Sequence, residues 1–149
     1  MPSRILLWSA VFVMTVVSCS EPSVYGNFVK IADADSSGRY RFTLEMTDSL
    51  SRYDIYFYTR IDAVDRDAES VEEDIPVNVM LVSPSGVRYT EKVYIRRETN
   101  TTDSRYYGDY DVLWRKDSVP VTFGSWLLYL STDSNIPGFR GFGIRVMKK

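Results

Sequence analysis

The chain has 149 residues, of which 44% are hydrophobic and 26% are charged, and its formal net charge is −2. These values are typical of one ordinary globular domain, and they exclude a disordered, collagen-like or multi-span membrane protein. Histidine is absent and Cys19 is the single cysteine. Their scarcity excludes histidine-based general base catalysis, a His/Cys zinc site and any intramolecular disulfide. With 18 basic and 20 acidic side chains, the composition also gives no reason to expect a nucleic-acid partner.

The N-terminal segment has the pattern of a secretory signal peptide. Arg4 supplies a positive charge, and residues 5–17 form an apolar stretch of 13 residues that only Ser9 and Thr15 interrupt. A membrane-spanning helix needs about 20 apolar residues to cross the hydrocarbon core. The stretch is therefore too short for a stable span and is interpreted as a signal sequence.

The residues that end this stretch, Val16-Val17-Ser18-Cys19, resemble the lipobox of bacterial lipoproteins. The resemblance implies that a diacylglyceryl group is attached to the Cys19 thiol and that the chain is cut before this residue. It divides the sequence into a signal peptide at 1–18, a lipid-anchored tether at 19–24 and a folded domain at 25–149. Two or three acyl chains hold a protein permanently on a membrane, whereas one chain holds it weakly.

The residue after the cysteine bears on the location of the protein. Position 20 is serine, and not the aspartate that resembles an inner-membrane retention signal in enteric bacteria. We therefore expect a cell-envelope protein that is anchored to the outer membrane and faces the periplasm.

Beyond the tether, the dominant period of hydrophobicity is two residues rather than 3.6. In residues 39–46 apolar side chains occupy every second position, as in a strand with one face in a core and the other in water. Residues 53–61 carry aromatic rings on both faces. This second segment is predicted to be a central strand or to have a covered outer face.

The rest of the chain continues in short apolar runs separated by turn residues. Residues 75–82 and 87–96 flank Ser83-Pro84-Ser85-Gly86, so the two runs predict a hairpin. Three further strands are expected at 106–114, 119–130 and 139–147, with a loop at 131–138. Near that loop, Gly138, Gly141 and Gly143 are expected to allow a bulge or a close approach of backbones.

Seven or eight short strands without a helical period predict an all-β domain. The expected architecture is an antiparallel β-sandwich, either jelly-roll or immunoglobulin-like. Aromatic residues make up 14% of the chain, and such side chains fill the gap of about 10 Å between facing sheets. The segment 62–74 breaks the pattern with seven acidic residues and one basic residue, and it is interpreted as an exposed insertion.

Three carboxylates of that insertion alternate along the chain, at Asp65, Asp67 and Glu69. Such a pattern can present oxygen ligands to a hard cation such as calcium. The segment lacks the spacing and the glycine of an EF-hand, however. A solvated acidic loop is the favoured interpretation, and no metal or cofactor is predicted.

A group of aromatic residues in the second half of the chain suggests a ligand site. The rings belong to Tyr106, Tyr107, Tyr110, Trp114 and Trp126. Carbohydrate-binding sandwiches often stack the apolar face of a sugar on such a platform. The favoured interpretation is that these rings fill the core, and a glycan-binding surface is kept as the alternative.

Paired acids would be needed for a glycoside hydrolase, facing each other across roughly 5 to 9.5 Å. The candidates on predicted strands are Glu45, Asp54, Glu91, Asp109 and Asp111. Acids are common on solvated strand faces, so their presence alone does not predict an enzyme. We expect a non-catalytic protein.

Several segments spread over most of the mature chain carry a family resemblance. They are Cys19, Tyr25 to Phe28, Tyr53-Asp54-Ile55-Tyr56-Phe57 leading to Arg60, the Pro84 and Gly86 turn, Ile136-Pro137-Gly138, Gly143-Ile144-Arg145-Val146 and a terminal lysine. With these segments the chain resembles the gliding motility lipoprotein family GldH of Bacteroidetes. The resemblance implies a non-catalytic envelope lipoprotein that associates with the gliding apparatus in motile species, with other envelope proteins as partners and no catalytic residues. Non-motile gut Bacteroidetes also carry members, and the insertion at 62–74 departs from the family pattern.

Overall fold

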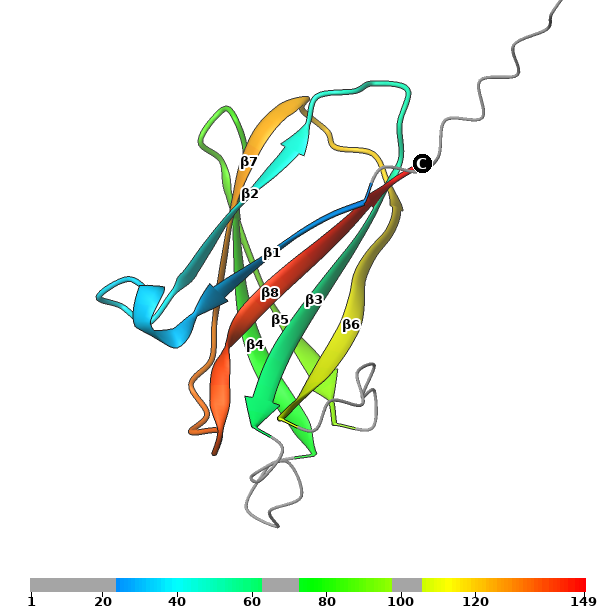
Figure 1. Cartoon of the computed structure of the whole chain (residues 1–149). Coiled ribbons are helices and arrows are strands. Elements are labelled where there is room, and N and C mark those ends of the chain that lie inside the picture. Colours follow the sequence, from blue (N-terminus) through cyan, green and yellow to red (C-terminus); the bar gives the residue numbers. More distant parts are fainter. Residues whose placement is uncertain (1–23, 63–72, 98–105) are drawn as a thin grey trace, which may run out of the picture.

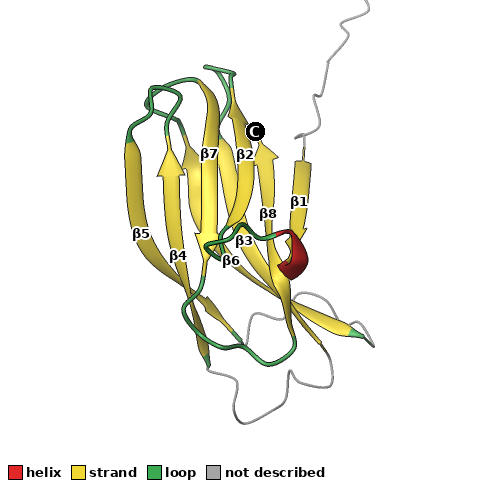
Figure 2. Cartoon of the chain, turned by 90° about the vertical axis from the view of Figure 1, so that its left-hand side faces the viewer, coloured by secondary structure: helices red, strands yellow, loops and turns green. Residues whose placement is uncertain are grey.

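The computed structural model describes residues 24–62, 73–97 and 106–149. Within them, two four-stranded antiparallel sheets pack face to face, as Figures 1 and 2 show. The β-sandwich expected from the sequence is confirmed. None of the helical structure in these ranges is long and apolar enough to cross a membrane. The elements are β1 (Val24–Lys30), the 3-10 helix η1 (Ile31–Asp33), β2 (Tyr40–Met46), β3 (Tyr53–Asp62), β4 (Asp74–Val82), β5 (Arg88–Arg96), β6 (Tyr107–Ser118), β7 (Gly124–Ser131) and β8 (Phe139–Lys148).

The strand order is β1-β8-β3-β6 in one sheet and β2-β7-β4-β5 in the other. Only β4 and β5 are both consecutive along the chain and neighbours in one sheet, and they form the predicted hairpin. Every other connection in the described fold passes from one sheet to the opposite one. Eight strands split four and four in this way are typical of a jelly roll, whereas an immunoglobulin constant-type sandwich divides seven strands four and three.

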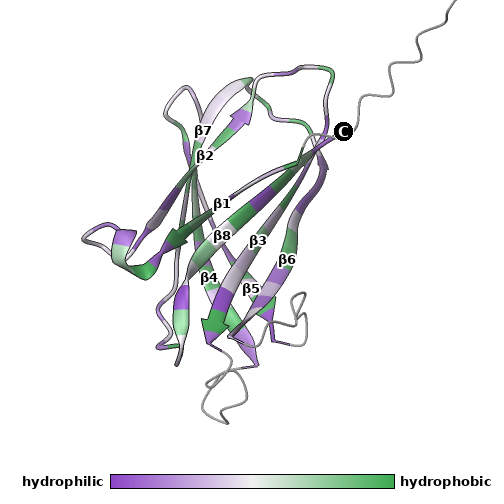
Figure 3. Cartoon of the chain, viewed as in Figure 1, coloured by the Kyte–Doolittle hydropathy of each residue, from purple (hydrophilic) through white to green (hydrophobic). Residues whose placement is uncertain are grey.

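The two-residue period of hydrophobicity determines which residues of each strand are buried and which are exposed. In β2, Tyr40, Phe42, Leu44 and Met46 are buried, and the residues between them are exposed. Figure 3 shows hydrophilic and hydrophobic bands alternating along β3 and β8. Strand β3 lies between β8 and β6, which confirms the central position predicted from its aromatic residues.

The core is made of aromatic and branched side chains from both sheets. Tyr40 of β2 meets Phe142 of β8 edge to face, with ring centroids 5.2 Å apart. Phe57 of β3 stacks on Trp114 of β6 at 4.6 Å. The first contact joins the two layers, and the second packs two neighbouring strands of one sheet. Aromatic burial therefore helps to hold the sheets together, as the composition suggested.

Two parts of the predicted strand pattern are wrong. The strand expected at 119–130 begins only at Gly124, because Pro120 has no backbone N–H for a sheet ladder. The apolar residues of 119–123 imitate a strand pattern while lying in a loop. At the other extreme, β1 begins at Val24, which the sequence assigned to the tether. Its Gly26 and Asn27 weaken the strand pattern, but β1 pairs with β8 along its whole length.

The strands run between two ends of the sandwich, which we call proximal and distal. The proximal end holds Val24, the 47–52 loop, the 83–87 turn, the 119–123 loop and Lys149. The distal end holds η1, the 132–138 loop and the points at which the described chain stops and resumes around 63–72 and 98–105. Figure 1 shows the C-terminus beside the start of β1 at the proximal end.

Ion pairs fasten the last two residues to the proximal end. Lys148 Nζ lies 2.8 Å from Asp48 Oδ2, and Lys149 Nζ lies 2.5 Å from Asp54 Oδ2. The hydrogen bond from Lys148 and further bonds from the Leu50 amide and Ser51 hydroxyl lower the pKa of Asp48 from 3.8 to about 2. The carboxylate form of Asp48 is therefore favoured in the folded state.

This shift predicts a specific acid sensitivity. A carboxyl group whose folded pKa is depressed stabilises the fold fully above its unfolded pKa, and this contribution is lost as pH falls towards the folded value. For Asp48 the loss runs from about pH 4 down to about pH 2. Thermal melts should show a steeper fall in Tm through this window for the wild type than for Asp48→Asn. Parallel Tm curves for the two proteins would contradict the role assigned to the Asp48 carboxylate.

Candidate binding surfaces

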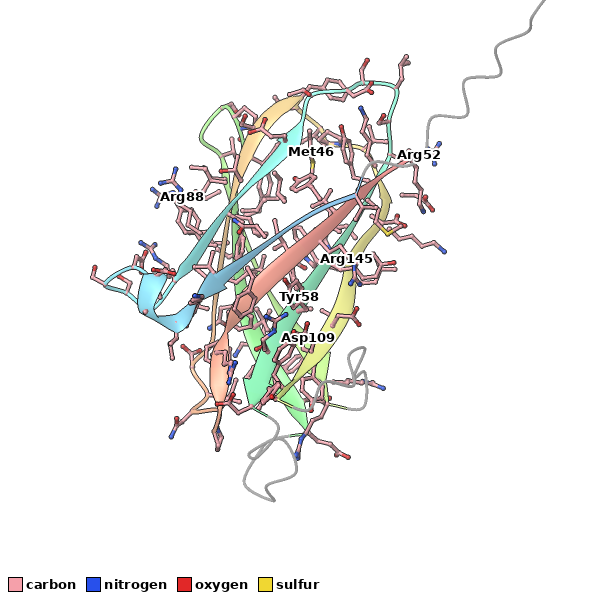
Figure 4. All side chains as sticks on the ribbon, in the orientation of Figure 1. Met46, Arg52, Tyr58, Arg88, Asp109 and Arg145 are labelled. Carbon is pink, nitrogen blue, oxygen red and sulfur yellow. The ribbon has the colours of Figure 1, made fainter. Side chains whose placement is uncertain are left out.

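The outer side of the β1-β8-β3-β6 sheet carries alternating arginine and aromatic side chains. Figure 4 shows three of its residues, Tyr58, Asp109 and Arg145, close together over the middle of this sheet. Among the described elements, no strand or helix lies over this side of the molecule (Figure 1). We call this surface the arginine–aromatic face, and it comprises Phe28, Tyr56, Tyr58, Arg60, Tyr107, Asp109, Asp111 and Arg145.

Arg60 contacts an acidic side chain and two aromatic rings on this face. Its Nε and Nη2 donate to the two Asp109 carboxylate oxygens at 2.7 and 3.0 Å, because the register pairs these two residues across β3 and β6. Its guanidinium lies 3.9 Å from the ring centroid of Tyr107 and 4.9 Å from that of Phe28. The carboxylate of Asp109 raises the pKa of Arg60. The bidentate ion pair and the two flanking rings therefore keep the Arg60 guanidinium charged and fix its orientation.

The side chain of Tyr58, a residue of β3, lies over Gly143 of the neighbouring strand β8 on the same face. Its ring stacks on Phe28 with centroids 5.8 Å apart, and partial burial raises the pKa of its hydroxyl. A Cβ atom at Gly143 would overlap the Tyr58 ring. This glycine therefore lets an aromatic ring lie flat against the sheet. The close approach of backbones expected in this region occurs at Gly141, where a Cβ atom would overlap the Val29 carbonyl oxygen.

The second arginine repeats the same arrangement further along the sheet. Arg145 Nη2 donates to Asp111 Oδ2 at 2.8 Å, and its guanidinium lies 4.8 Å from the Tyr56 ring centroid. The side chains of Arg145 and Asp111 are 40% and 16% exposed. Arginine and tyrosine are enriched in protein–protein interfaces. The face therefore offers a flat, preorganised surface of interface-like composition.

A pocket of about 400 Å³ opens at the proximal end, between the edges of the sheets formed by β5 and β6. Both tryptophans of the second half of the chain line it. Trp114 Nε1 donates to Glu91 Oε1 and Trp126 Nε1 donates to the Thr122 carbonyl, each at 2.8 Å. The other wall residues are Met46, Ile55, Val79, Leu81, Tyr89, Thr90, Arg115, Ser118, Val119, Pro120 and Val121.

The five rings proposed for a sugar platform do not share a surface. Tyr110, Trp114 and Trp126 are buried in the core, at 3%, 8% and 4% exposure. Tyr106 is exposed, and Tyr107 is half-buried next to Arg60 and Arg140. The core-filling interpretation therefore fits the three buried rings, because alternate residues of a strand point to opposite sides of its sheet.

The carboxylates considered for hydrolysis each have a partner. Glu91 contacts Arg115 and Trp114, Asp109 pairs with Arg60, and Asp111 pairs with Arg145. Glu45 accepts a bond from the Ser125 hydroxyl, and Asp54 accepts one from the Asp117 amide. The residues weighed as cation ligands, Asp65, Asp67 and Glu69, lie outside the described residues, as does Cys19.

Sequence reasoning did not find the arginine–aromatic face. The only signal was the aromatic area on both sides of residues 53–61, which indicated a covered or central strand. The pairing that builds the face joins Arg60 to Asp109, 49 residues away. Without the register between β3 and β6, neither residue could be assigned a partner.

Fold and surface together define an antiparallel jelly-roll sandwich with a preorganised arginine–aromatic face. No protein-family model matches the chain, and no curated protein matches it. Among solved structures, the chain is similar to the arabinose-bound MgGH51 α-L-arabinofuranosidase, with 15% identity and a TM-score of 0.36. The match covers 86% of this chain but only 23% of that enzyme's chain. A likeness this distant carries no argument about activity.

Proposed function

We propose that this chain is a non-catalytic, lipid-anchored envelope protein that binds a protein partner through its arginine–aromatic face. It works as an accessory or assembly subunit of a gliding-motility-type envelope complex. It is anchored at Cys19 on the periplasmic side of the outer membrane. The observation that carries the partner-binding role is the outer sheet face, which no described strand or helix covers and on which two ion-paired arginines are stacked on aromatic rings.

The anchoring part of the proposal is supported by sequence. The segment ending at Cys19 resembles a lipobox, and the chain as a whole resembles the GldH family. A chain without histidine and with one cysteine that is acylated can use neither a histidine base nor a His/Cys zinc site. These features favour a binding role over an enzymatic one.

The physical support for partner binding is preorganisation. The side chains of the face are already held by hydrogen bonds and stacking. They would therefore lose little conformational entropy when a partner binds. Arginine and tyrosine also dominate the energetic centres of protein interfaces. The glycan alternative is weaker, because three of the five rings on which it depends are buried.

We expect partner capture to depend on this face. Crosslinked envelopes should yield a reproducible set of envelope proteins with the wild-type lipoprotein. Recovery should fall by more than tenfold for the double variant Tyr56→Ala/Arg145→Ala, since loss of about 1.4 kcal/mol corresponds to a factor of ten in binding. Quantitative mass spectrometry of the captured proteins is the measurement.

The opposite sheet provides a matched control. Arg39 lies over the Tyr129 ring at 5.3 Å, so Arg39→Ala/Tyr129→Ala removes an equivalent pair from the other outer face. This variant should capture the same proteins as wild type. Equal recovery by both double variants, with both folded by circular dichroism, would refute binding through the arginine–aromatic face.

The anchor is tested separately by metabolic labelling. Palmitate should enter the wild-type protein and be absent from Cys19→Ala. Failure of palmitate to label the wild type, or equal labelling of the variant, would remove the lipoprotein assignment.

A further inference from the structure

We propose that the proximal end of the sandwich rests on the lipid bilayer, with its apolar loop tips inserted among the lipids and its basic side chains at the headgroups. This inference depends on the anchor in the proposed function, and it adds an orientation and a second membrane contact. The occupant of this end is a lipid surface rather than a protein.

The first argument is the reach of the tether. Val24 begins β1 at the proximal end, and Cys19 precedes it by five residues. A fully extended chain advances at most about 3.6 Å per residue, which limits this distance to roughly 18 Å. A lipid on Cys19 therefore holds the proximal end, and not the distal one, close to the membrane surface.

The second argument is the distribution of exposed apolar side chains. Leu50 of the 47–52 loop and Val121 of the 119–123 loop are 93% and 83% exposed. They come from separate loops at the same end of the fold. Surface positions of this kind have no stabilising role in the isolated domain and mark an interaction site when they gather together. Other exposed apolar residues at this end include Val24, Val87, Val119 and Phe123, whereas Ile31 and Tyr106 are exposed at the distal end.

The third argument is charge. Exposed basic side chains at the proximal end include Arg52, Arg88 and Lys116. Figure 4 shows Arg52 beside the C-terminus and Arg88 at the opposite edge of this end. Anionic lipids attract exposed basic side chains such as these, which lie at the same end of the fold as the apolar tips.

This geometry leaves the proposed partner surface accessible. The strands of the arginine–aromatic face run from the proximal to the distal end. When the proximal end rests on the bilayer, that face stands upright from the membrane. The membrane contact of the proximal end therefore does not block partner binding to the arginine–aromatic face.

The single native cysteine makes a direct test possible. In the acylated protein the Cys19 thiol is occupied, so Val121→Cys or Leu50→Cys introduces the only free thiol for an environment-sensitive fluorophore. Asn135→Cys in the 132–138 loop is the matched control, because Asn135 is exposed at the distal end. The full acylated proteins are reconstituted into vesicles of phosphatidylethanolamine and phosphatidylglycerol that contain lipids with a nitroxide on the acyl chain.

We expect the labels at positions 121 and 50 to shift to the blue and to be quenched several-fold more than the label at 135. All three substituted positions are exposed to solvent, so the variants should fold. If palmitate enters Cys19 but all three labels report water, the inference is overturned while the anchor stands. That result would assign the apolar tips to a protein partner. If palmitate does not enter, the anchor and this inference fail together.

Discussion

Replacing Phe57 by alanine should lower the free energy of unfolding by about 3 to 5 kcal/mol, the range for large aromatic truncations in cores. Phe57 is completely buried in the central strand β3 and stacks on Trp114 of the neighbouring strand. The change removes an entire ring from between the sheets and leaves a cavity that close-packed neighbours fill only in part. Urea unfolding followed by circular dichroism measures the loss.

Leu50→Ala is the control for this prediction. It truncates a large apolar side chain that is 93% exposed, so stability should change by less than about 0.5 kcal/mol. If Phe57→Ala cost no more than Leu50→Ala, Phe57 would not be in the core between the two sheets. The experiment therefore tests the packing of the sandwich as well as one residue.

Gly141→Ala should destabilise the fold by about 3 kcal/mol, because strain and steric overlap act together. Gly141 has φ +137°, a conformation that residues with a side chain rarely adopt. In addition, a Cβ atom there would overlap the carbonyl oxygen of Val29 in β1. We expect the variant to loosen β1 from β8, which hydrogen exchange of the β1 amides would detect.

The control substitution is Gly38→Ala. Gly38 has φ +70° in the turn before β2, and a Cβ atom there would have no neighbour within 4 Å. Its cost should be limited to the left-handed backbone, at about 1 kcal/mol. Equal losses for the two variants would show that the contact between β1 and Gly141 is unimportant.

Local sequence was sufficient to predict most strands. The alternation in residues 39–46 requires a half-buried strand, and Ser83-Pro84-Ser85-Gly86 requires a turn between its apolar flanks. Both features depend on residues that are close together in the chain. Where local signals misled, the cause was also local, since the valines and phenylalanine of 119–123 follow a strand pattern that Pro120 interrupts.

The candidate surfaces could not be predicted in the same way. Which tryptophans are buried depends on the side of the sheet that each faces, and therefore on register and packing. Trp114 and Trp126 belong to strands of different sheets, β6 and β7, but both line one pocket. Arg60 belongs to the arginine–aromatic face because the register of β3 and β6 places Asp109 beside it.

Composition and the period of two by themselves determined an all-β chain with one core, and the N-terminal motif predicts a lipid anchor. Only the tertiary structure decided between a jelly roll and an immunoglobulin-like sandwich, and only it revealed the arginine–aromatic face and the apolar proximal end. The physical reason is the range of the interactions. Alternation is a property of neighbouring residues, whereas strand order and shared surfaces arise from pairing between residues tens of positions apart, which a single sequence does not specify.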